Sequence, residues 1–514
     1  MNGNRFSDPP GNCARTIYHG TFIHLPRMPD IEATPESAPK YHLIVNHGAL
    51  WVNTSSGRIE GFDWNVNGDK ELDVLIEKHG WKVTENENAE NSVNIIKSRD
   101  AKNGFFFPGF VDTHIHAPQY PNSGIFGSST LLDWLETYTF PLESSFGIKE
   151  HPDTVPQSAH VVYNRVVSRT LSHGTTCAAY FATIHLPATN LLADICYARG
   201  QRAFIGRVCM DEPQTCPDFY RDESSEQCVA AARASIAYIR SLDPNAALVY
   251  PIITPRFAPS CTSASLMGLG ALAASTTPPT SIQTHISENK DEIDLVLSLF
   301  PENTSYADVY DKFNLLTPHT ILAHGVHLTE PERALIHSRG SAISHCPASN
   351  SAIGSGLCPV RTLLDDGIPV GLGTDVSGGY NPSILEAARQ ACLVSRLLSF
   401  QNGNTGNTVS GGKGREKLSV EEALHLATRG GAKVVGMEDD IGGFDVGMYW
   451  DAQLIELGGT VDVTRENWNH GSVDIFGWEK TEEKIAKWMW CGDDRNIRAV
   501  WVGGRLVHGE VPDF

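Results

Sequence analysis

The sequence predicts an α/β fold, a barrel of eight parallel strands alternating with helices, together with a small β-sandwich domain formed from both chain ends. The middle of the chain alternates short β-branched runs with helical patterns, which is typical of repeated βα units. Eight candidate strands can be counted there, the number of a TIM-type barrel. The two ends carry β signals, and each lacks the apolar sequence for a core of its own, so we expect them to pair.

Helix boundaries separate the expected barrel strands. A helix over 158–173 ends before Gly174, which is typical of a C-cap glycine. A second helix, over 225–242, carries Ala, Ile and Leu at helical spacing, and a third follows Thr329 and ends near Gly340. The strands are expected at 105–116, 175–185, 202–211, 247–256, 281–288, 320–324, 341–345 and 368–375.

The barrel is expected to occupy residues 104–440, with residues 1–103 and 441–514 as the two parts of the β-rich domain. The N-terminal part contains the β signals YHLIV and ALWV, and the C-terminal part contains DAQLIEL and NIRAVWVGGRLVHGE. Gly503 and Gly504 in the last segment predict a hairpin turn.

Two further segments lie near the end of the expected barrel. Residues 403–414 are poor in apolar side chains and predict a mobile surface loop. The helix expected over 419–435 opens with Ser419 and Glu422, the spacing of a capping box.

Composition limits the class of protein. The net charge of −20 argues against nucleic-acid binding, because no basic excess is present to neutralise phosphates. No apolar stretch reaches the length of a membrane span, and the N-terminal segment lacks the pattern of a signal or transit peptide. The eleven cysteines are scattered without a Cys-x-x-Cys pair, which suits a reducing compartment. We therefore expect a cytoplasmic protein that binds neither nucleic acid nor membrane.

The segment FFFPGFVDTHIHAPQY carries two histidines, His114 and His116, at the end of the first expected barrel strand. Side chains at i and i+2 of a strand point to the same side, so both imidazoles can face one metal ion. Taken alone, two histidines bonded to the backbone would be the commoner explanation. Residues elsewhere in the chain make metal binding the better explanation.

Further polar residues lie at the carboxyl ends of other expected strands: His285 on the fifth, His324 on the sixth and Asp375 on the eighth. Active sites of such barrels form at this end. Three imidazoles and one carboxylate suit zinc or ferrous iron with one position open for water. The sequence therefore predicts a mononuclear metal site, while Cys346, beside His345, is better explained as a core thiol.

Several motifs together resemble the amidohydrolase superfamily: VDTHIH, THISEN, AHG, SHCPASN and GLGTDVSGG. The finer pattern resembles the guanine deaminases within it, through PGFVDTHIHAPQY, TYTFP, GTTCAAYFATIH, GQRAFIGRVCMD, PIITPRFAPSC, THISEN and GDDRNI. This resemblance is dense from about residue 104 onward and loose before it. It implies a homodimer that uses one Zn²⁺ per chain to convert guanine to xanthine and ammonia.

The resemblance also implies roles for individual residues. The zinc ligands would be His114, His116, His285 and Asp375. Glu288 would be the proton shuttle, Asp375 would also accept a proton from water, and His324 would contact water and substrate. None of the expected strand ends carries a lysine that could bridge a second metal, so one ion is expected.

Several residues are candidates for contacts with the guanine ring. Gln119 offers both a donor and an acceptor, and Arg256 can donate to the 6-oxo oxygen that adenine lacks. Phe257 could stack on the ring, as could Trp134 or Phe181. The structural alternatives are a surface salt bridge for Arg256 and a core position for Phe257.

Two other functions fit part of this pattern. One is a different aminohydrolase or chlorohydrolase that acts on another heterocycle with the same metal ligands, and Gln119 and Arg256 would discriminate it. The other is a non-catalytic scaffold built on a degenerate hydrolase. The presence of every proposed ligand and of Glu288 argues against the scaffold.

Overall fold

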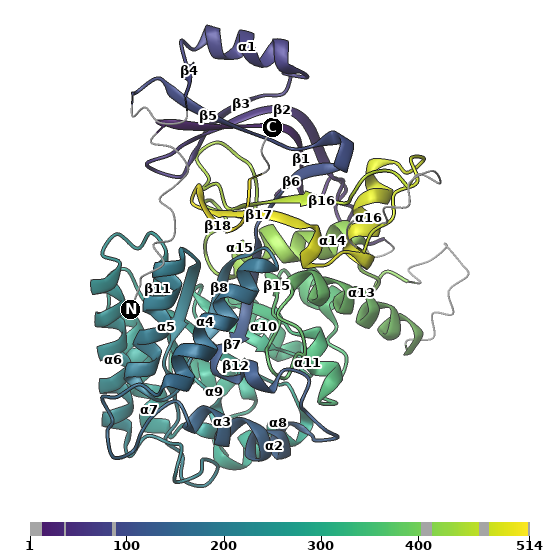
Figure 1. Ribbon diagram of the computed structural model, residues 1–514. Coiled ribbons are helices and arrows are strands. Elements are labelled where there is room, and N and C mark those ends of the chain that lie inside the picture. The colour runs from purple at the N-terminus through teal and green to yellow at the C-terminus, as the bar shows by residue number, and fades with distance from the viewer. Residues whose placement is uncertain (1–12, 35–36, 85–88, 402–413, 462–471, 512–514) are drawn as a thin grey trace.

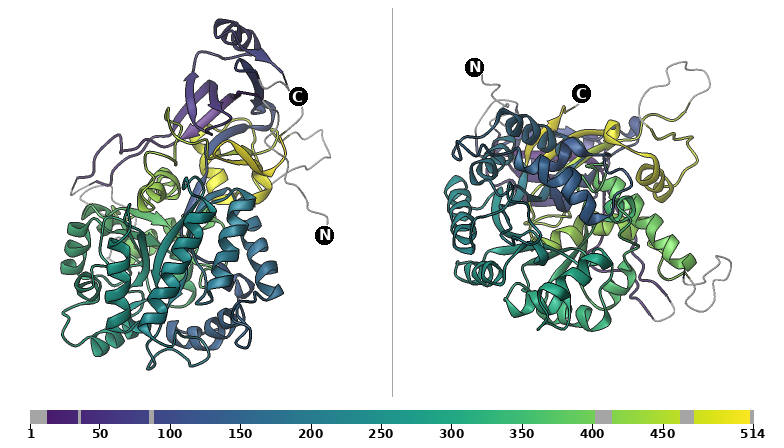
Figure 2. Two further views of the ribbon diagram at one scale, coloured as in Figure 1. Left: turned by 90° about the vertical axis from the view of Figure 1, so that its left-hand side faces the viewer. Right: turned by 90° about the horizontal axis from the view of Figure 1, so that it is seen from below.

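The computed structural model describes residues 13–34, 37–84, 89–401, 414–461 and 472–511. Strands from both ends of the chain, purple and yellow in Figure 1, lie together above a barrel coloured blue to green. Figure 2, seen from below, shows the helices lying around the barrel. Within the described part of the chain, no helix combines the length and apolarity that a membrane crossing requires. The loop expected over 403–414 lies outside the described residues except for Gly414.

Eight parallel strands form the barrel, as the sequence predicts. Their spatial order follows the chain, and backbone hydrogen bonds close the ring between its first and last members: Asp375 N donates to His114 O at 2.9 Å and His116 N to Val376 O at 3.0 Å. The strands are β7 (Phe110–His116), β8 (Thr175–Phe181), β9 (Arg202–Gly206), β11 (Val249–Pro255), β12 (Ser281–Ile286), β13 (Thr320–His324), β14 (Ala342–His345) and β15 (Val370–Leu372), with the short β10 (Val208–Cys209) beside β11.

Helices cover the outside of the barrel and bury their apolar faces on it. The helices predicted over 158–173, over 225–242 and after Thr329 are found nearly at their expected bounds, and the predicted capping box at Ser419 opens a helix. The covering helices are α4 (Gln157–Ser172), α5 (Leu186–Arg199), α6 (Ser225–Leu242), α7 (Ser263–Ala274), α8 (Lys290–Leu299), α9 (Tyr306–Lys312), α10 (Glu330–Arg339), α11 (Pro347–Ala352), α12 (Val360–Asp365), α13 (Ile384–Gln401), α14 (Val420–His425) and α15 (Gly431–Val434), the last two joined by the π-helical η5 (Leu426–Gly430).

The second sheet contains strands from both chain ends in the order β18-β17-β16-β6-β1-β2-β3, with β5 beside β1 and β4 beside β5. Its strands are β1 (Arg15–His24), β2 (Ile44–Asn53), β3 (Ile59–Asp63), β4 (Lys82–Val83), β5 (Ser92–Lys97), β6 (Gly104–Pro108), β16 (Ala452–Glu456), β17 (Ile497–Val502) and β18 (Arg505–Gly509). The predicted hairpin joins β17 to β18, and both glycines of its turn have the positive φ that such a turn requires, 53° at Gly503 and 75° at Gly504.

This sheet folds over an aromatic core. Tyr18 of β1 and Trp501 of β17 are separated by three strand spacings, roughly 14 Å in a flat sheet. Their ring centroids lie only 5.4 Å apart, and Tyr18 also contacts Phe106 and Trp450. The two limbs of the sheet therefore face one another across shared side chains, which is the sandwich-like packing expected from the sequence.

The bounds of the first predicted barrel strand are wrong. The apolar run over 105–116 forms two strands, and only β7 belongs to the barrel, because β6 pairs with β16 and β1 in the other sheet. The chain passes between the sheets at Gly109, where a Cβ atom would overlap Thr176. The barrel strand thus begins at Phe110.

Two helices of the β-rich domain were not expected from the sequence. α1 (Asp69–Lys78) buries Leu72, Leu75 and Ile76, which lie at helical spacing, and α16 (Thr481–Cys491) buries Trp488 in the core. Each helix is short and lies between segments with β signals, so its helical pattern is weak in the sequence alone.

Candidate active site

Four side chains converge at the carboxyl end of the barrel. His116 Nε2 lies 3.2 Å from His285 Nε2 and 3.4 Å from Asp375 Oδ1, and His114 Nε2 lies 3.1 Å from the same oxygen. Ligand atoms placed tetrahedrally at 2.0–2.1 Å from a zinc ion are roughly 3.4 Å apart. The spacing of these atoms therefore fits one small divalent ion.

The protonation states of the three histidines also fit a bound divalent ion. Burial lowers the pKa of His114, and it lowers the pKa values of His116 and His285 well below the ordinary value. The imidazoles are therefore neutral near pH 7, the form that binds a metal. His285 Nδ1 donates to the carbonyl oxygen of Arg256 at 2.5 Å, which leaves the lone pair on Nε2, the atom that faces the other ligands.

Asp375 is delivered to this point by the loop after β15. Asp112 on β7 accepts hydrogen bonds from Thr374 N at 3.0 Å and Thr374 Oγ1 at 2.6 Å, which ties that loop to the strand of the two histidines. Burial acts to raise the pKa of Asp375, but the contact with His114 and the positive charge favoured on His324 outweigh it and hold that pKa well below its usual range. The carboxyl group is therefore ionised.

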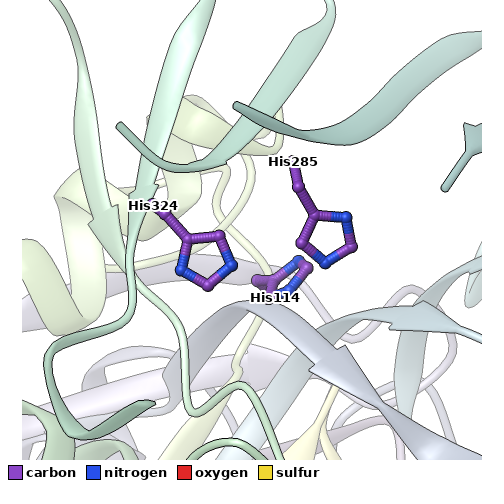
Figure 3. Close-up of side chains that lie close together, drawn as sticks. All are labelled: His114, His285 and His324. Atoms are coloured by element: carbon purple, nitrogen blue, oxygen red, sulfur yellow. The ribbon is translucent and has the colours of Figure 1, made fainter. Parts of the chain in front are cut away.

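His324 also lies near the four groups, and Figure 3 shows the side chains of His114, His285 and His324 pointing toward one another. Its electrostatics differ from those of the three neutral histidines. Burial acts to lower the pKa of His324, but Glu288 and Asp375 outweigh it and raise that pKa. A histidine that favours its proton suits contact with a carboxylate or water better than metal ligation.

Cys346 forms a second close group with His114 and Asp375. Its thiol is buried, and burial raises its pKa well above the ordinary value, so it stays protonated and is a poor ligand. This agrees with its interpretation as a core thiol.

Glu288 and His324 form an ion pair beside the ligand cluster. Glu288 Oε2 lies 3.3 Å from His324 Nε2, and Ser355 Oγ donates to Glu288 Oε1 at 2.8 Å. His324 Nδ1 pairs with Asn350 Oδ1 at 2.8 Å; because that oxygen can only accept, Nδ1 carries a proton. Burial raises the pKa of Glu288 to about 7, which suits a group that gains and loses a proton near neutral pH.

A cavity opens beside these groups. Its polar lining includes His116, His285, His324, Glu288 and Asp375, and Gln119 and Arg256 supply further polar groups. Its apolar lining comprises Leu131, Trp134, Leu135, Phe257 and Ile353.

The segment after β7 contributes to the lining of this cavity. α2 (Leu131–Trp134), the π-helical η3 (Leu135–Thr139) and α3 (Phe140–Ser144) lie at the end of the barrel opposite the β-rich domain. Trp134 is buried there, and its indole N–H has no hydrogen-bond partner among the described residues. This donor remains available to a ligand.

The residues expected to contact the substrate ring do not all lie at the cavity. Gln119, Arg256, Phe257 and Trp134 line the cavity. Arg256 is buried and pairs with the buried Glu143 at 2.7 Å, so it is not in a surface salt bridge. Phe181 packs instead on the rings of the ligand histidines, with centroids 4.6–4.9 Å away, and is not among the described residues that line the cavity. The suggestion that Phe181 stacks on the ring is therefore wrong.

Sequence reasoning did not single out Glu143, Asn350 or Ser355. Glu143 follows the motif TYTFP, and Asn350 ends the motif SHCPASN, so both segments were noted without these residues. A carboxylate between aromatic and apolar residues was the available signal for Glu143. Ser355 follows a turn and has no distinguishing pattern around it.

With this geometry established, the chain can be compared with known proteins. Residues 105–507 match the model of the amidohydrolase family, and the chain belongs to that family. Its relatives within the family include guanine deaminases. It is 53% identical to a probable guanine deaminase of Schizosaccharomyces pombe over 405 residues, which is 79% of this chain and 72% of the relative.

Two further comparisons extend over nearly the whole chain. It is 41% identical to the guanine deaminase of Dictyostelium discoideum over 491 residues, 96% of this chain and 98% of the relative. Its structure is similar to a crystal structure of guanine deaminase from C. acetobutylicum with guanine bound in the active site, with a TM-score of 0.75, 30% identity, and coverage of 96% and 100% of the two chains.

Proposed function

We propose that the protein is a guanine deaminase, which hydrolyses guanine to xanthine and ammonia. The observation that carries the proposal is the cavity that Arg256 and Gln119 line together with the His/Asp cluster and Glu288. The similarity to guanine deaminases across most of their length supports the same reaction.

We propose that His114, His116, His285 and Asp375 hold one zinc ion per chain. When bound there, zinc would lower the pKa of a water from about 16 to roughly 7 and so supply hydroxide at neutral pH. Three neutral imidazoles and one carboxylate with close, converging atoms support this set. The raised pKa of His324 supports its exclusion from the set.

The proton transfers can be assigned to residues of the chain. Asp375, ionised and facing the cavity, takes the proton of the attacking water. Glu288, whose pKa of about 7 keeps part of it protonated at neutral pH, donates to a ring nitrogen while oxygen adds to C2 of guanine. Asp375 then passes its proton to the 2-amino group, the C2–N bond breaks as ammonia leaves, and the C2 hydroxyl returns a proton to Glu288 as the C2 carbonyl of xanthine forms. His324, with its Nδ1 proton held by Asn350, orients Glu288 and contacts the substrate.

Substrate recognition is assigned to other residues that line the cavity. Arg256 donates to the 6-oxo oxygen, Gln119 contacts the polar edge of the ring, and Phe257 packs on its face. Adenine presents an amino group where guanine presents the oxygen, so a buried arginine would lose its partner. The site should therefore reject amino-purines that lack the oxo group.

We further propose that the protein acts as a homodimer in the cytosol. The dimer rests on the resemblance to the guanine deaminases, and the location is supported by eleven free cysteines, ten of them buried, which suit a reducing compartment. A solution mass near twice 56.1 kDa in light scattering is expected for the dimer, and a mass near 56.1 kDa would reject it.

The activity is tested by measuring ammonia and xanthine from guanine with purified, zinc-loaded protein, with adenine and cytosine in parallel. Turnover of guanine alone is expected. Turnover of another ring without guanine would keep the site and replace the substrate, while no turnover at a full zinc content would reject the proposal.

A further inference from the structure

Glu143 is a buried carboxylate that the proposed reaction leaves without a role. It lies on α3, is fully buried, and is not among the residues that line the cavity. A buried carboxylate is costly unless its oxygens are hydrogen-bonded. The partners of Glu143 show what its charge does.

Three donors surround this carboxylate. Gln119 Nε2 donates to its Oε1 at 2.7 Å, while Arg256 Nη1 and the hydroxyl of Tyr220 donate to its Oε2, each at 2.7 Å. Two of the three donors, Gln119 and Arg256, line the cavity, and Tyr220 does not. Glu143 therefore connects the two polar groups that face the proposed position of the ring.

The contacts of Gln119 determine which way round its amide lies. Its Nε2 faces a carboxylate oxygen, which can only accept, and its Oε1 accepts from Ser377 N at 3.2 Å, which can only donate. The reversed amide would place oxygen against oxygen and N–H against N–H. Glu143 and the Ser377 amide thus hold the donor and the acceptor of Gln119 in a single arrangement.

Arg256 is held at both ends. Its guanidinium pairs with Glu143 and lies over the ring of Phe140, another residue of α3, at 5.3 Å, while its carbonyl accepts from His285 Nδ1. The position of its free N–H groups relative to the ligand cluster is therefore set from two sides.

We propose that Glu143 is a positioning residue that makes the site selective for a 6-oxo-2-aminopurine, by fixing the amide orientation of Gln119 and the guanidinium of Arg256. This inference rests on the proposed function, because it assumes that the ring lies against these two groups.

The test is Glu143→Gln, which keeps the shape and changes the polarity. A glutamine has one accepting and one donating end, so either orientation places a donor against Gln119 Nε2 or against Arg256. The KM for guanine is expected to rise about 10- to 100-fold, with a smaller change in kcat. Selectivity for guanine over 2,6-diaminopurine, which keeps the 2-amino group and lacks the oxygen, is expected to fall by about tenfold or more.

Tyr220→Phe is the matched control. It also removes a hydrogen bond from the Glu143 carboxylate, but it leaves Gln119 and Arg256 correctly paired. Near-native KM and selectivity are expected. If both variants change KM and selectivity equally, or if Glu143→Gln leaves them unchanged, Glu143 is a structural residue and the proposal is overturned.

A second variant keeps the proposal testable if Glu143→Gln does not fold. In the exchange Gln119→Glu with Glu143→Gln, each hydrogen bond again joins a donor to an acceptor, so a melting temperature above that of Glu143→Gln alone is expected. A raised KM for guanine is expected, since an accepting carboxylate replaces the amide; a native KM would overturn the proposal. The native enzyme in the same assay separates this outcome from failure of the proposed function, which would show as no guanine turnover by the native protein.

Discussion

Replacement of Arg256 by alanine tests the substrate assignment most directly. The side chain is 2% exposed, lines the cavity and makes its ion pair with a carboxylate that is fully buried. Loss of a charge-assisted hydrogen bond to the ring should cost about 1.5–3 kcal/mol, or roughly 10- to 150-fold in kcat/KM for guanine. The variant also leaves Glu143 without its cation, which should lower the free energy of unfolding by about 3–5 kcal/mol.

The assay combines xanthine formation with metal analysis and urea denaturation. Zinc content should stay unchanged, because Arg256 contributes only its backbone carbonyl to the ligand His285. Arg495→Ala is the control, an exposed arginine whose pair with Asp493 lies on the surface and should contribute little. The reasoning is refuted if Arg256→Ala keeps kcat/KM for guanine within about threefold of the native value at equal zinc content.

Three other predictions concern the acid, the metal and the pH dependence of stability. Glu288→Gln should lower kcat by about 10²- to 10⁴-fold at unchanged zinc content, and a near-native kcat in steady-state assays would remove Glu288 as the proton donor. Asp375→Asn should lower the stoichiometric zinc measured by metal analysis, and chelation of the native protein should abolish activity that added zinc restores; full zinc in the variant would contradict its role as a ligand. Burial lowers the pKa of His24 to about 4, so the unfolded chain binds the extra proton between pH 6.5 and 4. The free energy of unfolding should thus fall as pH drops through this range, by about 3 kcal/mol for His24 alone. Denaturation curves of His24→Gln should show a correspondingly weaker pH dependence, and an unchanged dependence would reject this account.

Much of the fold follows from local pattern. Strand and helix periods differ, so the βα alternation is visible in the sequence, and the turn at Gly503 and Gly504 requires a conformation that glycine adopts readily. The proximity of the ligand residues could also be predicted, since the carboxyl ends of parallel strands meet at one end of a barrel.

Other features depended on contacts between distant segments. The run over 105–116 is apolar throughout, and only pairing with β16 and β1 separates β6 from the barrel. Phe181 and Trp134 are equivalent in the sequence as aromatic residues, but Phe181 packs on the ligand histidines while Trp134 lines the cavity.

The sequence by itself determined the βα order, the residues at the strand ends and, through their chemistry, the kind of ion they could bind. Only the tertiary structure decided which polar groups share a proton or a charge. Glu143 lies 24 positions from Gln119 and 113 from Arg256, and Asn350 lies 26 from His324. Hydrogen bonding acts over about 3 Å in space, whatever the separation along the chain, so these pairs exist only once the barrel has closed.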